Sequence, residues 1–160
     1  MSTPRLQTGL SGDQSCGVVS LLNRLLADEY LLYTKLRNFH WNVVGPDFPQ
    51  LHALFEQQYD QLDEAIDEIA ERARAVGGLA EGTLAGFLKL TRLTEAGAPL
   101  LDARGMVAEV LADHEAIIRS LRADLVEAGE KWGDAGTNDY LTGLMERHEK
   151  MAWMLRATLG

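Results

Sequence analysis

Hydrophobic residues recur along most of the chain at steps of three and four, the period of an amphipathic helix. The first run predicts a helix from about residue 16 to the Gly45-Pro46 pair, with apolar positions Val18, Leu22, Leu25, Leu32, Leu36 and Phe39. A second predicted helix begins at Asp47, which with Gln50 resembles a capping box, and ends at Gly77-Gly78. Its apolar positions are Leu51, Leu54, Phe55, Leu62, Ile66, Ile69 and Ala73.

The remaining chain predicts a long connection followed by two more helices. Residues 79–101 hold one short apolar patch between Gly, Thr and Pro residues, which indicates a crossover with a short helix. Later helices are expected from about Val107 to near Gly133 and from about Asn138 onward. No segment alternates as a strand would. This order is typical of an all-α four-helix bundle with one long crossover, the ferritin-like connectivity.

The bulk composition suits one globular domain. The chain has 160 residues, of which 46% are hydrophobic, and we expect a single domain over residues 16–160 behind a flexible tail of residues 1–15. Because no run of about 18 apolar residues and no secretory pattern occurs, the expectation is a soluble cytoplasmic protein without a membrane partner. Cys16 is the only cysteine, so no internal disulfide is expected and we assign it no role.

The charge is strongly acidic. The formal net charge is −9, and the sequence pI is about 4.8. Such a body repels the phosphate backbone of nucleic acids and attracts cations. Cations are therefore the better expectation for a partner.

The second predicted helix carries an unusual stripe of acids. Between Asp47 and Val76 it holds eight carboxylates and only two basic residues, Arg72 and Arg74. At about 100° per residue, six of these acids fall between about 0° and 120° when His52 is set to zero, whereas the apolar set lies at about −100° to −40°. The six are Glu56, Asp60, Asp63, Glu64, Asp67 and Glu71. One interpretation is a solvated acidic face.

Two features of the stripe favour metal binding instead. Like charges one turn apart destabilise a helix unless cations neutralise them. In addition, His52 with Glu56 and Asp67 with Glu71 each place two ligand groups one turn apart. The two pairs are symmetric about position 61.5, because 52 and 71 have that average, as do 56 and 67. The two pairs are about 22 Å apart along one helix, so a single chain cannot close them on one ion. Two antiparallel copies about a twofold axis would form two such sites.

His40, near the end of the first helix, can add a second imidazole from the same chain. Mixed imidazole and carboxylate ligands suit iron, with zinc and manganese as competitors. The Glu-x-x-His pattern of intrasubunit di-iron bundles is absent, because the residues three before the histidines are Arg37, Pro49, Leu111 and Met145.

These residues resemble the signature of the Dps mini-ferritins, named as DNA-binding proteins from starved cells. The resemblance lies in the segment Lys35–Val43, in Phe48, in Leu51–Glu56 with Tyr59, and in Asp67–Arg72. It implies a hollow homododecamer that binds Fe(II), oxidises it with hydrogen peroxide or oxygen, stores the ferric mineral and so protects against oxidative damage.

The resemblance also implies roles for single residues. His40 and His52 match histidine ligands from one subunit, and Asp67 and Glu71 match carboxylate ligands from its twofold mate. Glu56 matches an acidic position, often Asp, that helps to hold a second iron. Trp41 matches a tryptophan beside the iron site that takes up oxidising equivalents, while a packing aromatic is the alternative.

Two further sets of residues are less specific. Glu130, Asp134 and Asp139 surround the last predicted turn, where family members resemble one another in lining an acidic threefold pore for iron. A polar turn in which Asn138 or Asp139 starts the helix is the alternative. His114 and His148 lie among apolar helix positions and are expected to be core or interface histidines and not ligands.

The main alternative function is a nucleoid-associated, DNA-compacting Dps protein. Members of that kind usually use basic tails, whereas residues 1–15 contain only Arg5 and the last six residues only Arg156. DNA binding is therefore not expected. A purely structural bundle is a third reading, and the presence of both His52 and Asp67 speaks against it.

Overall fold

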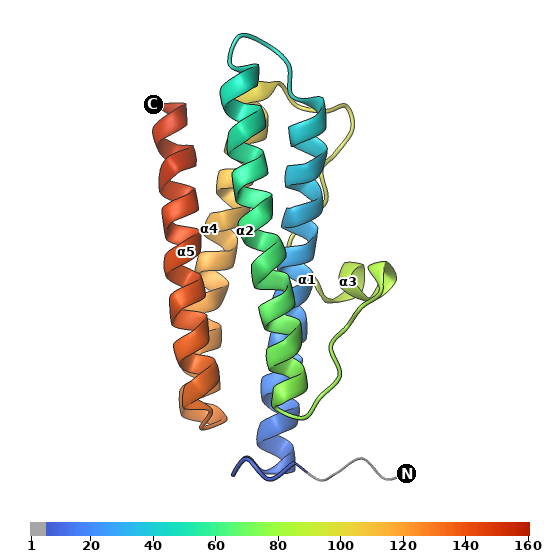
Figure 1. Ribbon diagram of the computed structural model, residues 1–160, viewed down its shortest axis with the longest axis vertical. Coiled ribbons are helices and arrows are strands. Elements are labelled where there is room, and N and C mark those ends of the chain that lie inside the picture. Colours follow the sequence, from blue (N-terminus) through green and yellow to red (C-terminus); the bar gives the residue numbers. More distant parts are fainter. Residues whose placement is uncertain (1–5) are drawn as a thin grey trace.

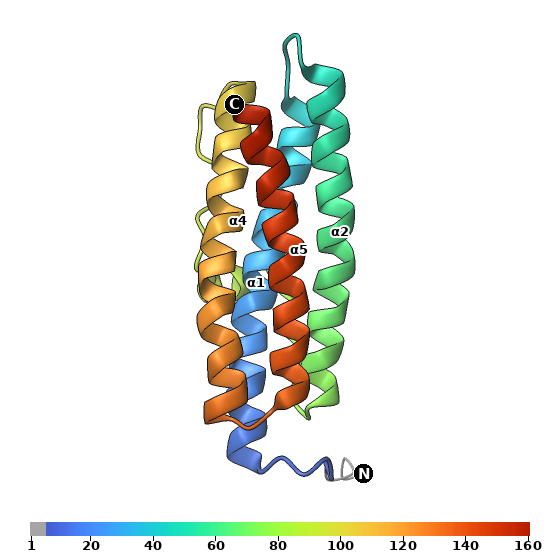
Figure 2. The same ribbon diagram turned by 90° about the vertical axis from the view of Figure 1, so that its left-hand side faces the viewer.

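The computed structural model describes residues 6–160, and within them it contains helices and no strand. The helices are α1 (Gly12–Asn42), α2 (Phe48–Ala75), α3 (Leu84–Leu90), α4 (Ala103–Val126) and α5 (Ala135–Leu159), with a π-helical segment η1 (Glu127–Lys131) after α4. Figures 1 and 2 show the four long helices side by side in one bundle. The predicted four-helix bundle with a crossover and a short helix is confirmed.

The bundle consists of two helical hairpins. The closest pairs are α1 with α2 and α4 with α5, while α3 packs on α1 outside the bundle (Figure 1). The core is formed by leucine, valine and phenylalanine side chains from all four long helices, as their three-and-four spacing requires. Among the described residues no helix is long and apolar enough to cross a membrane.

The first helix begins earlier than the sequence indicated. Ser11 caps α1, because its hydroxyl accepts the Gln14 backbone N–H while the Gln14 side chain accepts the Ser11 N–H. Residues 12–15 are therefore helical, and the boundary of the expected tail at residue 15 is wrong. Residues 1–5 of that tail lie outside the described part of the chain.

The second helix begins and ends near the expected positions. Asp47 occupies the N-cap position, but its side chain makes no capping hydrogen bond, so the predicted capping box is not formed. Gly77 ends the helix with a φ of +97°, a conformation that glycine adopts without steric cost. There the backbone N–H groups of Gly77 and Gly78 reach back to the carbonyls of Arg74 and Ala73.

The crossover is fastened to the bundle by one arginine. Arg92 donates to the buried carboxylates of Asp28 on α1 at 2.7 Å and Asp124 on α4 at 2.9 Å. Burial raises the pKa of the Asp124 carboxyl, and the charge of Arg92 opposes that rise. Since an unpaired buried carboxylate is costly, this arginine stabilises both helices where the crossover passes them.

Candidate metal site

The end of α1 and the start of α2 bring two histidines together. His40 is buried in the last turn of α1, and His52 is half-buried in the first turns of α2. Their rings stack with centroids 3.7 Å apart and an angle of 19° between the planes. The short connection at residues 43–47 therefore positions both imidazoles as the sequence suggested.

Reciprocal hydrogen bonds define the orientation of this pair. His40 Nδ1 lies 2.8 Å from the His52 carbonyl oxygen, and His52 Nδ1 lies 2.8 Å from the His40 carbonyl oxygen. A carbonyl can only accept, so each Nδ1 carries a proton. In a neutral imidazole the lone pair is then on Nε2, the atom that would ligate a metal. Both rings are thus held in the ligand tautomer by the backbone.

Glu56 lies one helical turn after His52 and is exposed. Tyr59 donates its hydroxyl to Glu56 Oε1 at 3.3 Å, and its ring lies edge-on to His40 with centroids 5.3 Å apart. Burial raises the pKa of Tyr59, and the charge of Glu56 adds to the rise while Arg37 opposes it. Tyr59 therefore keeps its proton and orients Glu56, a contact that the sequence did not reveal.

The two other predicted ligands lie away from the histidines in the same chain. Asp67 and Glu71 are exposed on α2, about 22 Å and about 28 Å of helix from His52 at 1.5 Å per residue. Within residues 6–160 no group of three or more His, Cys, Asp or Glu side chains is arranged to hold a metal ion. One chain therefore does not bring the whole predicted ligand set together.

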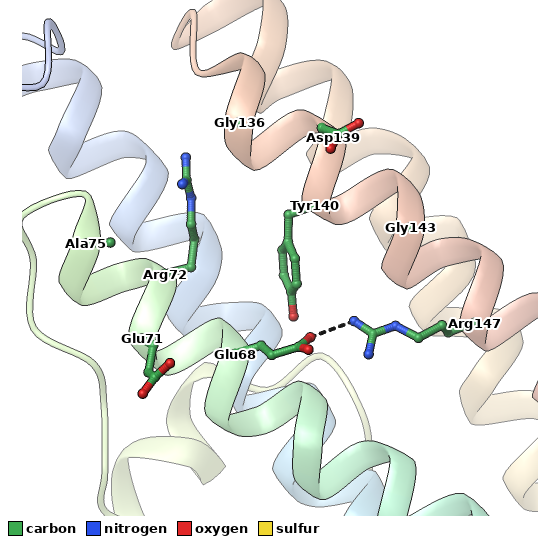
Figure 3. Close-up of a pocket in the computed structure, with 9 residues that line it drawn as sticks. All are labelled: Glu68, Glu71, Arg72, Ala75, Gly136, Asp139, Tyr140, Gly143 and Arg147. Carbon is green, nitrogen blue, oxygen red and sulfur yellow. Dashed lines mark hydrogen bonds and ion pairs between the residues drawn. The ribbon is translucent and has the colours of Figure 1, made fainter.

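An open pocket lies between the end of α2 and the start of α5 (Figure 3). Its volume is about 610 Å³, and it includes Glu71 on the α2 side and Asp139 on the α5 side. In Figure 3 Arg147 reaches across to Glu68, with a separation of 2.7 Å, and Tyr140 projects between the helices. Arg72 lines the same space. The histidines do not line it, and two guanidinium groups make it a poor cation site.

The three predicted pore acids behave differently. Glu130 and Asp139 are exposed. Asp134 is buried, caps α5 by accepting the Thr137 N–H, and binds Arg72 at 2.9 Å. Burial raises the pKa of the Asp134 carboxyl, but the Thr137 hydrogen bonds and the charge of Arg72 outweigh this and hold the pKa below its ordinary value.

For Asp134 the assignment to a cation pore is therefore corrected, since its carboxylate is already occupied within the chain. The helix starts at Ala135, so neither Asn138 nor Asp139 caps it. Gly136 leaves the necessary space, because a Cβ atom there would lie 2.8 Å from an Arg72 nitrogen.

Trp41 projects from the last turn of α1 and is 64% exposed. Its ring lies 5.2 Å from the Arg37 guanidinium carbon. Such exposure does not suit a packing aromatic of the isolated chain. Its role as a sink for oxidising equivalents stays a prediction.

The other two histidines belong to a buried network that joins all four long helices. His148 Nε2 lies 2.8 Å from Glu29 Oε1, the two Nδ1 atoms of His148 and His114 lie 2.9 Å apart, and His114 Nε2 lies 3.2 Å from Gln58 Oε1. His114 and His148 are core histidines, as expected. Glu29 and Gln58 were missed because their polarity gives no sign of burial.

Comparisons with known proteins agree with this architecture. Residues 19–160 match the ferritin-like domain family. The chain is 50% identical over 154 residues to a low-temperature-induced protein of Nostoc sp. strain PCC 7120, covering 96% of this chain and 86% of that one. It is 42% identical over 142 residues to DNA protection during starvation protein 2 of Bacillus anthracis, covering 89% and 96%.

Among solved structures, the Dps protein of Vibrio cholerae O1 superposes with a TM-score of 0.90 at 31% identity, covering 100% of this chain and 99% of that one. That protein is described as a member of a broad superfamily of ferritin-like diiron-carboxylate proteins. The chain therefore belongs to the ferritin-like family. Within that family it is a Dps-type mini-ferritin. This membership supports a general role in iron storage and protection.

Proposed function

We propose that this protein is a ferroxidase whose sites are shared between two subunits. The observation that carries the proposal is the stacked pair His40–His52, in which each Nδ1 donates a hydrogen bond to a backbone carbonyl. One chain offers two imidazole Nε2 atoms and Glu56 at one end of α2, and two free carboxylates at the other. A twofold mate with antiparallel α2 would bring Asp67 and Glu71 to the histidines.

The proposed substrate is Fe(II), because neutral imidazole and carboxylate ligands suit it, although zinc or manganese could occupy the same ligands. Each of two Fe(II) ions gives one electron to one hydrogen peroxide molecule, and the O–O bond breaks. Both oxygens leave as oxide, hydroxide or water in the ferric product, so hydroxyl radical is not released. Molecular oxygen is the alternative oxidant.

Further parts of the proposal concern the assembly. Twelve copies would form a hollow cage that stores the ferric mineral, with Glu130 and Asp139 drawing cations toward a pore. Twelve chains of net charge −9 repel DNA, so the DNA-compacting alternative is not favoured. A cytoplasmic location remains our prediction.

The sharing of the site can be tested by complementation. One variant carries His40→Ala with His52→Ala, and the other carries Asp67→Ala with Glu71→Ala. Each alone should oxidise Fe(II) slowly, because every site lacks half of its ligands. A mixed dimer contains one site that lacks both the histidines and the carboxylates, and one site that is intact. About half of the wild-type sites therefore return in each mixed dimer.

Activity should return only when the two variants are refolded or expressed together, since finished cages do not exchange subunits on mixing in this scheme. Mass spectrometry verifies that mixed particles have formed. As a control, each variant is refolded together with the wild-type chain. The activity of these particles should follow the number of intact sites. If verified mixed particles are as inactive as the two parents, the site is not shared.

A further inference from the structure

Arg37 is an arginine beside the candidate site with no acidic partner among the residues that the structure describes. Its guanidinium carbon lies 4.7 Å from the ring centre of Tyr59 and 5.7 Å from that of Tyr33, and it donates to the Tyr33 hydroxyl at 3.2 Å. Within residues 6–160 it forms no ion pair, although Arg72, Arg92, Arg122, Arg147 and Arg156 all do. The aromatic rings hold its charge in one place.

Asp63 has the opposite property. It is exposed on α2, and within the described chain no basic side chain pairs with it. At about 100° per residue it lies about 20° from His52, between His52 and Glu56 on the same stripe. A second copy that meets the ligands of this stripe must therefore also meet Asp63.

The register of the ligands fixes what Asp63 faces. In antiparallel copies centred on position 61.5, residue 60 lies at the level of residue 63 of the partner. Tyr59 is one residue, or about 1.5 Å, from that level, and Arg37 sits on its ring. Without a cation, Asp60 and Asp63 of both copies would place four carboxylates at the twofold axis, which is unfavourable at close range.

We propose that Arg37 forms an ion pair with Asp63 of the partner subunit, twice in each dimer. This inference rests on the shared-site dimer of the proposed function and names the contact that fixes its register. The same pairing explains why the acidic stripe tolerates its central carboxylates, which are too far from the histidines to bind the same iron. Arg37 positions the partner helix and does not contact iron.

A charge-exchange experiment on the full chain tests the pair. Arg37→Asp places two carboxylates at each contact, and Asp63→Arg places two guanidinium groups there. Each variant alone should assemble at least about tenfold less well than the unmodified chain at equal, low protomer concentration. When the two variants are refolded together, each contact again joins opposite charges, and the assembled fraction measured by sedimentation should return to within about twofold of the unmodified chain.

Two controls make the result decisive. A chain carrying both Arg37→Asp and Asp63→Arg restores every contact with itself, so it should assemble alone, which separates loss of pairing from loss of folding. As a control, Arg122→Glu and Glu149→Arg each disrupt an ion pair that lies within one chain, between α4 and α5. Mixing these two variants cannot restore that pair, so any loss of assembly that they cause should persist in the mixture.

The proposal is overturned if the single variants assemble as well as the unmodified chain, or if the mixture assembles no better than its parts. It is also overturned if assembly needs an added divalent cation and does not depend on Arg37, because the carboxylates are then neutralised by an ion. Sedimentation requires no iron. Unmodified cages that assemble but do not oxidise Fe(II) therefore refute the proposed function and leave the ion pair intact.

Discussion

Replacing His114 by Gln should alter how the stability of the protein depends on pH. Gln58 donates its amide to the Met151 carbonyl, so its oxygen faces His114 Nε2, which must donate. His114 Nδ1 is then a lone pair that accepts from His148 Nδ1. A second proton on His114 would set two N–H groups against each other. Burial and the charge of His148 accordingly hold the pKa of His114 well below its ordinary value.

Proton linkage gives the sign and the size of this change in the pH dependence of stability. Below pH 6.5, the ordinary pKa of histidine, the unfolded chain takes up a proton at this position and the folded chain does not, so acid favours unfolding. An imidazole that stays neutral in the folded chain over this range costs about 1.4 kcal/mol of stability between pH 7.5 and 5.5. His114→Gln removes this cost but also loses hydrogen bonds worth about 1–3 kcal/mol at neutral pH.

The assay is urea unfolding of both proteins at one fixed protomer concentration, since oligomer stability depends on concentration. The destabilisation caused by His114→Gln should shrink by about 1.4 kcal/mol on going from pH 7.5 to 5.5. Groups that do not contact His114 behave alike in both proteins and cancel in the difference. A destabilisation that is equal at the two pH values, or larger at pH 5.5, would show that His114 is not a neutral acceptor in the folded state.

Two functional predictions are simpler. Replacing Glu130 by Gln and Asp139 by Asn together should slow Fe(II) uptake at low ionic strength and leave unfolding unchanged, whereas Asp134→Ala, which removes a helix cap, should cost about 1 kcal/mol of stability; uptake kinetics that do not change would remove the two exposed acids from the pore. Duplex DNA should not be retarded by the protein in a gel-shift assay at physiological salt and neutral pH, because the chain carries a net charge of −9; clear retardation that weakens with added salt would contradict this.

The helices and the histidine pair could be predicted because both depend on local signals. The three-and-four spacing of apolar residues defines each long helix, and the short Gly45-Pro46 connection places His40 near His52. The start of α1 was misplaced because the capping box at Ser11 and Gln14 precedes the first apolar positions. Local pattern thus gives the body of a helix more reliably than its end.

The parts that were missed depend on contacts between distant segments. Arg92 pairs with Asp28 and Asp124, which are 64 and 32 residues away in sequence. Asp134 seemed to be one of three equivalent acids until Arg72, 62 residues earlier, was seen to bind it. Polar residues at such positions have no period in the sequence, because their burial is offset by a specific partner and not by a hydrophobic face.

In the proposed dimer, the division of the ligands between the two ends of α2 links iron binding to subunit association. The His40 carbonyl is one of the last carbonyls of α1, which lack partners within a helix, and the His52 ring binds it at 2.8 Å. The same hydrogen bond therefore ends a helix and orients a ligand, so the histidine half-site exists before any partner arrives. Asp67 and Glu71 are exposed, and in the proposed dimer they bind a metal together with the partner's histidines. Free energy from binding Fe(II) at such a site adds to the free energy of dimer formation, because the complete ligand set exists only in the dimer.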